Sequence, residues 1–305
     1  MWEKNKGSVL MIKIANAPCS WGVDYADDIN NPKWEDVFQD ISKAGYKYCE
    51  IGPYGFLPND SNKISDFLIE MKLKVIGGFI FDYLHNSNEH YRIKSKIIST
   101  CIFLKELKAN VFVIIDHISQ RRMQTSGNRN KSISLPLGEY KTMINFLNDI
   151  CNLVKEEYDL IPVIHPHAGT YIEYDDEIDK IINDVNNNYL SLCLDTAHLK
   201  YSGIDPYAAI LKYQKLVKHM HFKDINAEVL QNVHLNNLDF DTAVSKGVFT
   251  PLGNGLIDFK KIYKNLNSIG YEGYATIEQD IDPTKSLKAI DYAKESLRFL
   301  NQFKD

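Results

Sequence analysis

The chain has 305 residues, of which 44% are hydrophobic and 25% charged, a composition typical of a soluble globular protein. It carries 35 basic and 40 acidic side chains, and the resulting net charge of -5 argues against binding to nucleic acid or to an anionic membrane. No apolar run approaches the ~20 residues of a membrane-spanning helix.

The amino-terminal segment and the cysteines indicate in which compartment the protein is expected. No long apolar segment follows Met1, so we expect no signal peptide, and residues 1–10 fit a short disordered lead-in within a single domain spanning 1–305. The five cysteines are widely spaced, odd in number and form no CxxC motif, which is typical of reduced, buried thiols. We therefore expect a cytoplasmic protein.

Strand-like and helix-like segments alternate through the first half of the chain. Val37, Phe38 and Ile41 recur at helical spacing before Gly45, whose type favours the end of a helix. Ser61 is a candidate cap for the second helix. The segment 116–135 is polar and basic, and we expect it to cover a site. The expected strands are 11–17, 48–51, 75–80 and 111–115, and the expected helices are 34–44, 61–71, 90–107 and 137–158.

The second half contains four apolar runs that each deliver a histidine or a carboxylate at their carboxyl end. These residues are His165, Asp195, His221 and Glu278. Eight strand–helix units in roughly 250 to 300 residues predict a (β/α)8 TIM barrel. A doubly wound open sheet is the alternative, but no GxGxxG motif follows a strand. The helices expected here are 177–185, 206–213, 259–269 and 284–303.

The four strand-end residues predict a metal site. The carboxyl ends of barrel strands meet on one face, and neighbouring strands lie about 4.8 Å apart, so the side chains can point at one centre. Two imidazoles and two carboxylates suit Mn²⁺, Co²⁺, Fe²⁺ or Zn²⁺ better than Ca²⁺, and the absence of a thiolate argues against a structural zinc. We favour Mn²⁺ or Co²⁺, with Zn²⁺, Fe²⁺ and Mg²⁺ as alternatives. Each residue alone would more often be a cap or loop anchor, but four in succession favour a site.

Further polar residues lie close to the same strand ends. His167 is a candidate proton shuttle, and His198 is a candidate for substrate contact or for support of a ligand. His219 is more typical of packing inside the barrel. Lys223 and Asp224 form either a solvated ion pair or part of the site.

Three residues follow the first, second and fourth strands. Trp21 is suited to stacking on a sugar ring, and Glu50 to acting as a base or binding a hydroxyl. His117, with Arg121 and Arg122 nearby, is suited to contacting an anionic or polyhydroxyl substrate. A core plug or a loop anchor is the structural alternative for each.

Short motifs at the strand ends also follow one another in a fixed order. They occupy residues 17–22, 50–58, 165–170, 195–198, 219–224, 251–258 and 270–280. In this order they resemble the xylose-isomerase-like TIM-barrel superfamily of sugar isomerases, epimerases and dehydratases, and most closely its inosose dehydratases. The resemblance runs nearly end to end and implies a metal-dependent enzyme acting on a small polyol or ketose.

The resemblance implies metal ligation at the ends of strands five to eight. Many members carry glutamate on strand five, where this chain has His165, so His167, Glu173 or water are alternatives there. The implied chemistry removes a proton beside a carbonyl to give an enediolate, with His198, His167 and Glu50 as candidate acid–base groups. The enediolate then either expels a hydroxyl as water or is reprotonated, which gives dehydration in one case and isomerisation or epimerisation in the other.

Two other functions stay open. Apurinic-site endonucleases share the superfamily, but this chain offers too few paired ligands on strands two to four for their cluster of several metals. A non-catalytic sugar-binding barrel would leave the metal set unused. Barrels of this kind are often homo-oligomers, and the fold alone does not choose among these activities.

Overall fold

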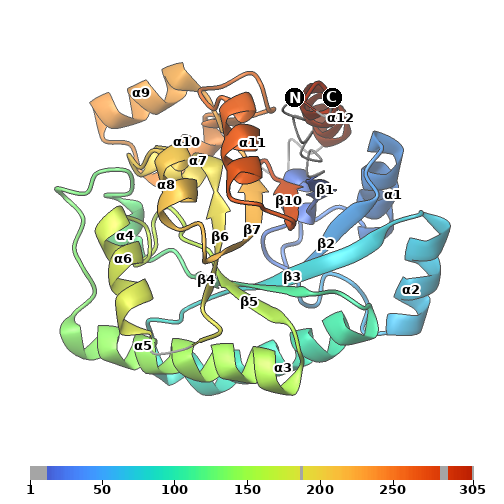
Figure 1. The fold of residues 1–305 in the computed structure, drawn as a ribbon, viewed down its shortest axis with the longest axis horizontal. Helices are drawn as coiled ribbons and strands as arrows, with labels where there is room; N and C mark the ends of the chain where they lie inside the picture. The colour runs from blue at the N-terminus through green and yellow to red at the C-terminus, as the bar shows by residue number, and fades with distance from the viewer. Residues whose placement is uncertain (1–11, 186–187, 282–287, 304–305) are drawn as a thin grey trace, which may run out of the picture.

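A closed barrel of eight parallel strands is the centre of the computed structural model, which describes residues 12–185, 188–281 and 288–303. The sheet closes because β1 pairs with β10 on one side and with β2 on the other. This confirms the predicted barrel and excludes the open sheet (Figure 1). The barrel strands are β1 (Lys13–Asn16), β2 (Tyr48–Pro53), β3 (Lys74–Asp82), β4 (Val111–Asp116), β5 (Ile161–Ile164), β6 (Ser191–Asp195), β7 (Val217–Phe222) and β10 (Tyr274–Ile277).

Helices surround this barrel and connect its strands (Figure 1). None of those in the described part of the chain is long and apolar enough to cross a membrane. The α-helices are α1 (Trp34–Ala44), α2 (Ser61–Glu70), α3 (His90–Glu106), α4 (Gln120–Met123), α5 (Leu137–Asn152), α6 (Asp175–Asp184), α7 (Thr196–Tyr201), α8 (Pro206–Lys212), α9 (Ala227–Asn236), α10 (Phe240–Ser245), α11 (Phe259–Ser268) and α12 (Ala289–Asn301). Shorter turns are η1 (Pro18–Trp21), η2 (Ser87–Glu89) and the π-helical η3 (Leu153–Glu157).

Each predicted strand and helix has a counterpart in this order. Gly45 ends α1 with a φ of 103°, as predicted. The cap of α2 is different, because the side chain of Asp60 accepts a hydrogen bond from the backbone N–H of Lys63 and Ser61 is already helical. Between β7 and β10 the sequence predicted only α11, and the structure adds α9, α10 and the antiparallel pair β8 (Asp224–Ile225) and β9 (Phe249–Thr250). The expected lead-in 1–10 and the start of the last helix, 284–287, lie outside the described residues.

The buried interior of the barrel has an apolar part and a polar part. Alternation along a strand sends every second side chain inward, so the residue types on each strand decide which part it builds. Strands β4, β5 and β6 contribute the apolar cluster Val111, Val113, Ile115, Val163 and Cys193. Strands β2, β7 and β10 contribute the buried polar residues Glu50, His219, His221 and Thr276. The polar part underlies the site described below.

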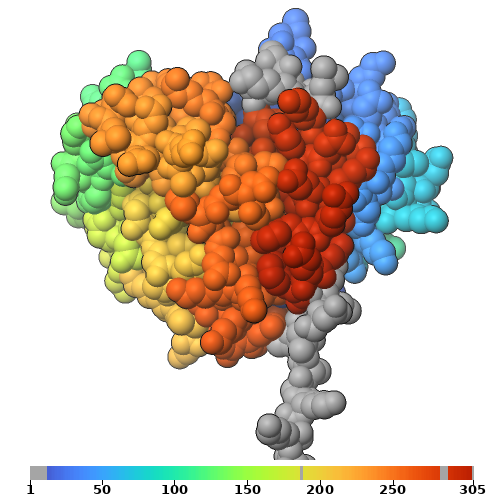
Figure 2. All heavy atoms as spheres, turned by 90° about the horizontal axis from the view of Figure 1, so that it is seen from above, coloured from blue at the N-terminus to red at the C-terminus, as the bar shows by residue number. Residues whose placement is uncertain are grey.

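The first and last helices pack beside each other and complete the outer layer. The hydroxyl of Tyr46, just after α1, donates to the carbonyl of Ala293 in α12 at 2.8 Å. In Figure 2 the blue and dark red parts of the chain accordingly lie side by side. The barrel is thus closed both in its sheet and in its ring of helices.

Asp224 is a structural anchor, and the prediction that it contacts substrate or forms a solvated ion pair is wrong. Its Oδ1 accepts from the backbone N–H groups of Ile225 at 2.8 Å and Ile257 at 3.0 Å. Its Oδ2 accepts from those of Gly253 at 2.9 Å and Gly255 at 3.1 Å. The carboxylate is completely buried and ties the loop before α11 to the β8–β9 pair. A side chain at Gly255 would collide with it.

We expect Asp224→Asn to lower the free energy of unfolding by about 3 kcal/mol, because an amide N–H2 would face backbone donors in place of a carboxylate oxygen. Urea denaturation followed by circular dichroism measures this loss. Asp205→Asn is the matched control, since Asp205 is an exposed cap of α8 and asparagine caps a helix nearly as well. Equal losses in the two variants would contradict the anchoring role.

Candidate metal centre

Four of the predicted residues meet at the carboxyl ends of β5, β6, β7 and β10. The ligand atoms of His165, Asp195, His221 and Glu278 all lie within 4.8 Å of one another, and the four side chains are buried. Ligand atoms about 2.1 Å from a tetrahedral ion are separated by roughly 3 to 4 Å. The distances of 3.8 Å from His165 Nε2 to Asp195 Oδ2 and 3.1 Å from His221 Nδ1 to Glu278 Oε2 fall in this range.

The lone pairs of these residues are arranged as a cation requires. Nε2 of His221 lies 3.2 Å from Glu50 Oε1, and since a carboxylate only accepts, Nε2 carries the ring proton. Nδ1 of the same ring lies 3.1 Å from Glu278 Oε2. Burial opposes a charge on this ring, but Cys193, Glu278 and Glu50 raise the pKa of His221 well above its usual value, so the contact with Glu278 is an ion pair. Oδ2 of Asp195 is buried without a hydrogen-bond partner. A metal ion bound between these atoms would replace the proton on Nδ1 and lie beside the same carboxylates, so the donor set fits a cation.

Asp195 owes its orientation to the element that follows it. It is the last residue of β6 and the cap of α7, where its Oδ1 accepts from the backbone N–H groups of Ala197 at 2.8 Å and His198 at 2.9 Å. Capping fixes the carboxylate and uses one of its oxygens. The other oxygen is left to the group of four.

Glu50 lies beneath this group rather than in contact with solvent. Its Oε1 accepts from Nε2 of His219 at 2.8 Å, from Nε2 of His221 and from the hydroxyl of Thr276 at 2.5 Å. Burial opposes ionisation, but His221 and His219 hold the pKa of Glu50 well below its usual value. A carboxylate with so low a pKa is a weak base. This geometry supports a role in orienting His221 instead of the predicted role as a base, and it makes His219 a support residue as expected.

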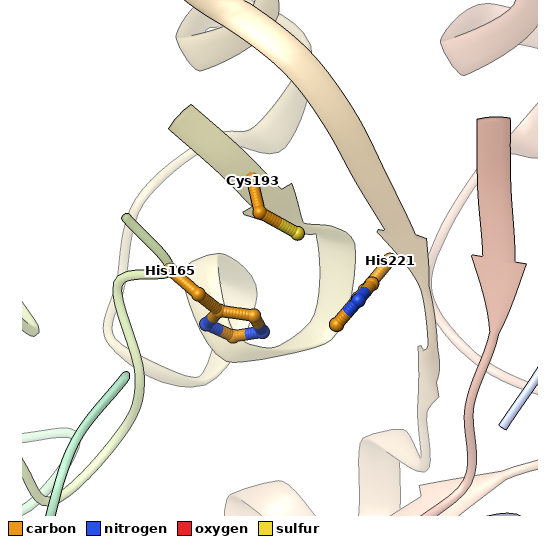
Figure 3. A group of neighbouring side chains, drawn as sticks. All are labelled: His165, Cys193 and His221. Atoms are coloured by element: carbon orange, nitrogen blue, oxygen red, sulfur yellow. The ribbon is translucent and has the colours of Figure 1, made fainter. Parts of the chain in front are cut away.

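A thiol lies beside the two ligand histidines, and the sequence reading missed it. Figure 3 shows His165, Cys193 and His221 directed toward one another, and their ligand atoms lie within 4.8 Å. No sulfur ligand was predicted near the strand ends, and the structure places this one there. Cys193 precedes Asp195 by two residues on β6, so strand alternation was the available signal. Burial raises the pKa of the Cys193 thiol to about 12, which makes it a weaker ligand at neutral pH than the carboxylate of Asp195.

The alternatives for strand five occupy three different places. His165 follows β5 directly and belongs to the group of four. His167 packs against His198, with ring centroids 3.8 Å apart and ring planes tilted by 36°. Glu173 is buried away from the group, where it accepts from the backbone N–H of Gly127 at 2.7 Å and lies 3.3 Å from the guanidinium of Arg122. Glu173 therefore does not close the site.

A cavity of about 310 Å³ is lined by three members of the group of four, His165, His221 and Glu278. Lys223 lies in it with its ammonium 2.8 Å from Asp280, 3.1 Å from His198 Nε2, 3.4 Å from Glu278 and 3.5 Å from Asp195. Burial opposes this charge, but the three carboxylates hold the pKa of Lys223 well above its usual value. The lining residues are Cys19, Asp24, Tyr25, Phe79, Phe81, Ile115, Ile118, His165, His167, His221, Lys223, Phe240, Asp241, Val244, Ser245, Glu278, Asp280 and Ile281.

Several predicted contact residues do not line this cavity. Trp21 is buried in the outer core, as in its alternative as a core plug. The ring of His117 stacks between Phe81 at 4.7 Å and Tyr83 at 4.1 Å, and its Nδ1 donates to the carbonyl of Ile118. Arg122 is completely buried and pairs with Glu177, so it is not available to an anionic substrate. The segment 116–135 is held down by such pairs.

Asp24 and Asp280 line the cavity, and the sequence reading gave neither a role. Asp280 follows Glu278 by two residues, a spacing that indicated the same side of the chain. Burial and the charge of Asp280 raise the pKa of Asp24 to about 7. Burial lowers the pKa of His167 to about 3. Nδ1 of His167 lies 2.8 Å from the carbonyl of Ala168 and therefore carries the ring proton, which leaves Nε2 as the proton acceptor.

Comparison with known proteins places this geometry in a family. Residues 38–303 match the family model described as a xylose isomerase-like TIM barrel. The inosose dehydratase of Clostridium beijerinckii is 31% identical over 94% of this chain and 98% of its own length. The inosose dehydratase of Clostridium tetani is 29% identical over 99% of both chains.

Solved structures share the fold at lower identity. A probable 3-DHS dehydratase, AsbF, from Bacillus anthracis has a TM-score of 0.72 at 16% identity and covers 95% of this chain and 99% of its own. The 3-keto-D-glucoside 4-epimerase YcjR from E. coli has a TM-score of 0.70 at 16% identity, covering 96% and 100%. The IOLI protein with a bound zinc atom has a TM-score of 0.70 at 15% identity, covering 96% and 98%. The chain belongs to the family of xylose isomerase-like TIM barrels.

Proposed function

We propose that the protein is a divalent-metal-dependent inosose dehydratase, a lyase that removes water from a neutral polyhydroxy ketone. The observation that carries the proposal is the buried group of His165, Asp195, His221 and Glu278, whose ligand atoms lie within 4.8 Å of one another beside a cavity of about 310 Å³. The relatives that match nearly the whole chain are inosose dehydratases, which supports this substrate.

The four donors would hold the ion through neutral imidazoles and ionised carboxylates. Burial lowers the pKa of His165 well below its usual value, so its ring stays neutral and able to donate a lone pair. A divalent ion bound there polarises a substrate carbonyl and acidifies the neighbouring C–H. Mn²⁺ or Co²⁺ remains our preference for this mixed set. Zinc in the IOLI protein supports Zn²⁺ as the main alternative.

The charge of the cavity supports an uncharged substrate. Four of the described residues that line it are acidic, namely Asp24, Asp241, Glu278 and Asp280. Lys223 is the only lysine or arginine among those lining residues. Since this ammonium is already surrounded by carboxylates, no cation is left to pair with a phosphate or a carboxylate of the substrate. The same argument disfavours sugar phosphates and the phosphate backbone of abasic DNA. The aromatic rings of the lining, and not Trp21, are placed to contact the apolar face of a polyol.

A neutral imidazole and a neutral carboxylic acid provide the proton transfers that dehydration needs. His167 lines the cavity with an unprotonated Nε2, and we assign it the removal of the proton. Asp24, whose pKa is raised to about 7, is assigned the protonation of the departing hydroxyl. Nε2 of His198 accepts a hydrogen bond from Lys223, so His198 positions that ammonium. Lys223 then donates to a substrate oxygen. Enolisation at one carbon followed by loss of the β-hydroxyl as water completes the reaction.

Epimerisation of a ketose is the second candidate, because it shares the enediolate and because YcjR, with the same fold, is an epimerase. In epimerisation Asp24 would return a proton to carbon, whereas in dehydration it would protonate the departing hydroxyl. A non-catalytic barrel would leave the convergence of the four ligand residues unexplained.

The five free, buried cysteines are consistent with a cytoplasmic setting.

Incubation of metal-loaded protein with scyllo-inosose is expected to release a dione lighter by one water, detected by mass spectrometry. Chelation should remove this activity, and Mn²⁺, Co²⁺ or Zn²⁺ should restore it, because the ion supplies the polarisation of the carbonyl. A product of unchanged mass that exchanges its α-hydrogen in deuterated water would indicate epimerisation. No product with any of these ions or Mg²⁺ would reject the dehydratase.

Asp24→Asn is expected to lower kcat/KM for dehydration about 100-fold, because the variant lacks the proton donor. In the parent protein Asp24 must be protonated to act, so activity should fall as pH rises through about 7. The variant should lose this alkaline decline, as a pH–rate profile of each protein shows. Asp27→Asn is the control, since Asp27 is exposed three residues away and should leave both rate and profile unchanged. An identical profile in Asp24→Asn would rule out Asp24 as the acid.

Cys193→Ser is expected to leave the Kd for Zn²⁺ within about threefold, because the protonated thiol is not a ligand. Asp195→Asn should weaken binding by on the order of 100-fold, since a charged ligand is lost. Isothermal titration measures both affinities. The Co²⁺-loaded parent protein should also lack the intense near-ultraviolet absorption of a cobalt–thiolate bond. That absorption, lost in Cys193→Ser, would instead place Cys193 in the metal set.

A further inference from the structure

A second group of potential ligands lies beside the first. The ligand atoms of His167, His198 and Asp280 lie within 4.8 Å of one another, at the carboxyl ends of β5, β6 and β10. Nε2 of His198 is 3.6 Å from Oδ2 of Asp280, a spacing suited to two ligands of one ion. Nε2 of His167 is the ring atom not used by the carbonyl of Ala168. Two imidazoles and a carboxylate are a typical divalent-metal set.

The ammonium of Lys223 is bound within this second group. Its Nζ donates to Oδ1 of Asp280 at 2.8 Å and lies 2.9 Å from Oδ2 of the same carboxylate. It lies 3.1 Å from Nε2 of His198. It is also 3.5 Å from Asp195 and 3.4 Å from Glu278, which belong to the first group. The positive charge thus lies between the two sets of donors.

Lys223 is held firmly in this place. Its backbone N–H donates to Oγ1 of Thr196 at 3.0 Å, and that hydroxyl donates back to the carbonyl of Lys223 at 2.6 Å. The ring of Phe249 lies 5.1 Å from the ammonium and adds a cation–π contact. The side chain of Lys223 is only 2% exposed, so the ammonium is paired with these protein groups and not with bulk water.

The charges around Lys223 balance with one divalent ion. Asp195, Glu278 and Asp280 supply three negative charges, and a divalent ion with the ammonium supplies three positive ones. A second divalent ion beside the ammonium would leave a buried excess of positive charge, which is costly. We infer that Lys223 takes the place of a second cation, so that the protein binds one divalent ion and holds a latent second site at His167, His198 and Asp280.

Removal of the ammonium should therefore change the metal stoichiometry. The inference rests on the proposed function for the first ion only. Equilibrium dialysis of metal-free protein against Zn²⁺, followed by elemental analysis, is expected to give one ion per chain for the parent and two for Lys223→Ala. Lys223→Ala combined with Asp280→Asn should return to one, because the second set loses its carboxylate. Lys218→Ala, on the exposed side of β7, should stay at one.

Lys223→Met separates loss of charge from loss of volume. Its terminal methyl lies where Cε of the lysine was, so it removes the charge but blocks an ion at the former Nζ position, and one ion is expected. Two ions in the parent protein would overturn the inference even if the variants failed to fold. One ion in a folded Lys223→Ala would do the same. No ion in the parent would instead reject the proposed function.

Discussion

A carboxylate buried inside the barrel sets the geometry of the whole site. Glu50 accepts from both histidines of β7 and from Thr276 of β10, so three strands are joined through one oxygen atom. Because Nε2 of His221 is committed to this contact, its Nδ1 is left for Glu278 and the cavity. A buried carboxylate is tolerated only where donors satisfy it. The polar part of the barrel interior is therefore what permits a metal group above it.

The hydrogen-bond partners of each carboxylate oxygen distinguish acidic residues that can bind a ligand from acidic residues that only stabilise the fold. Asp195 uses one oxygen to cap the start of α7, and its other oxygen accepts no hydrogen bond and faces the group of four and Lys223. Both oxygens of Asp224 accept hydrogen bonds from backbone N–H groups, four in all, so neither is available to a ligand. The carboxylate of Glu173 likewise accepts hydrogen bonds from Arg122 and from the backbone, so it is not available to a ligand. Sequence position alone does not distinguish these cases, because all three follow or end a strand.

The fold was predictable because strand and helix periods alternate clearly, and the group of four was predictable because barrel topology brings strand ends together. His165, Asp195, His221 and Glu278 needed no knowledge of side-chain direction. Cys193 and Asp280 were missed although each lies two residues from a predicted ligand, since the alternation rule was not applied to them. Asp24 had no such signal. It follows a turn after β1, and its place in the cavity depends on how that loop packs, which local sequence does not encode.

The electrostatics that would recruit an ion also shape the acid–base groups around it. An acidic cavity raises the cost of each further negative charge, so the pKa of Asp24 rises, with burial as the larger cause. The same burial keeps His167 neutral, and the nearby ammonium of Lys223 opposes any positive charge on it. The lining of one cavity thus contains an imidazole that stays neutral and a carboxyl group that takes up a proton near pH 7. In the proposed mechanism the choice between dehydration and epimerisation depends on whether this carboxyl group delivers its proton to a departing hydroxyl or to carbon.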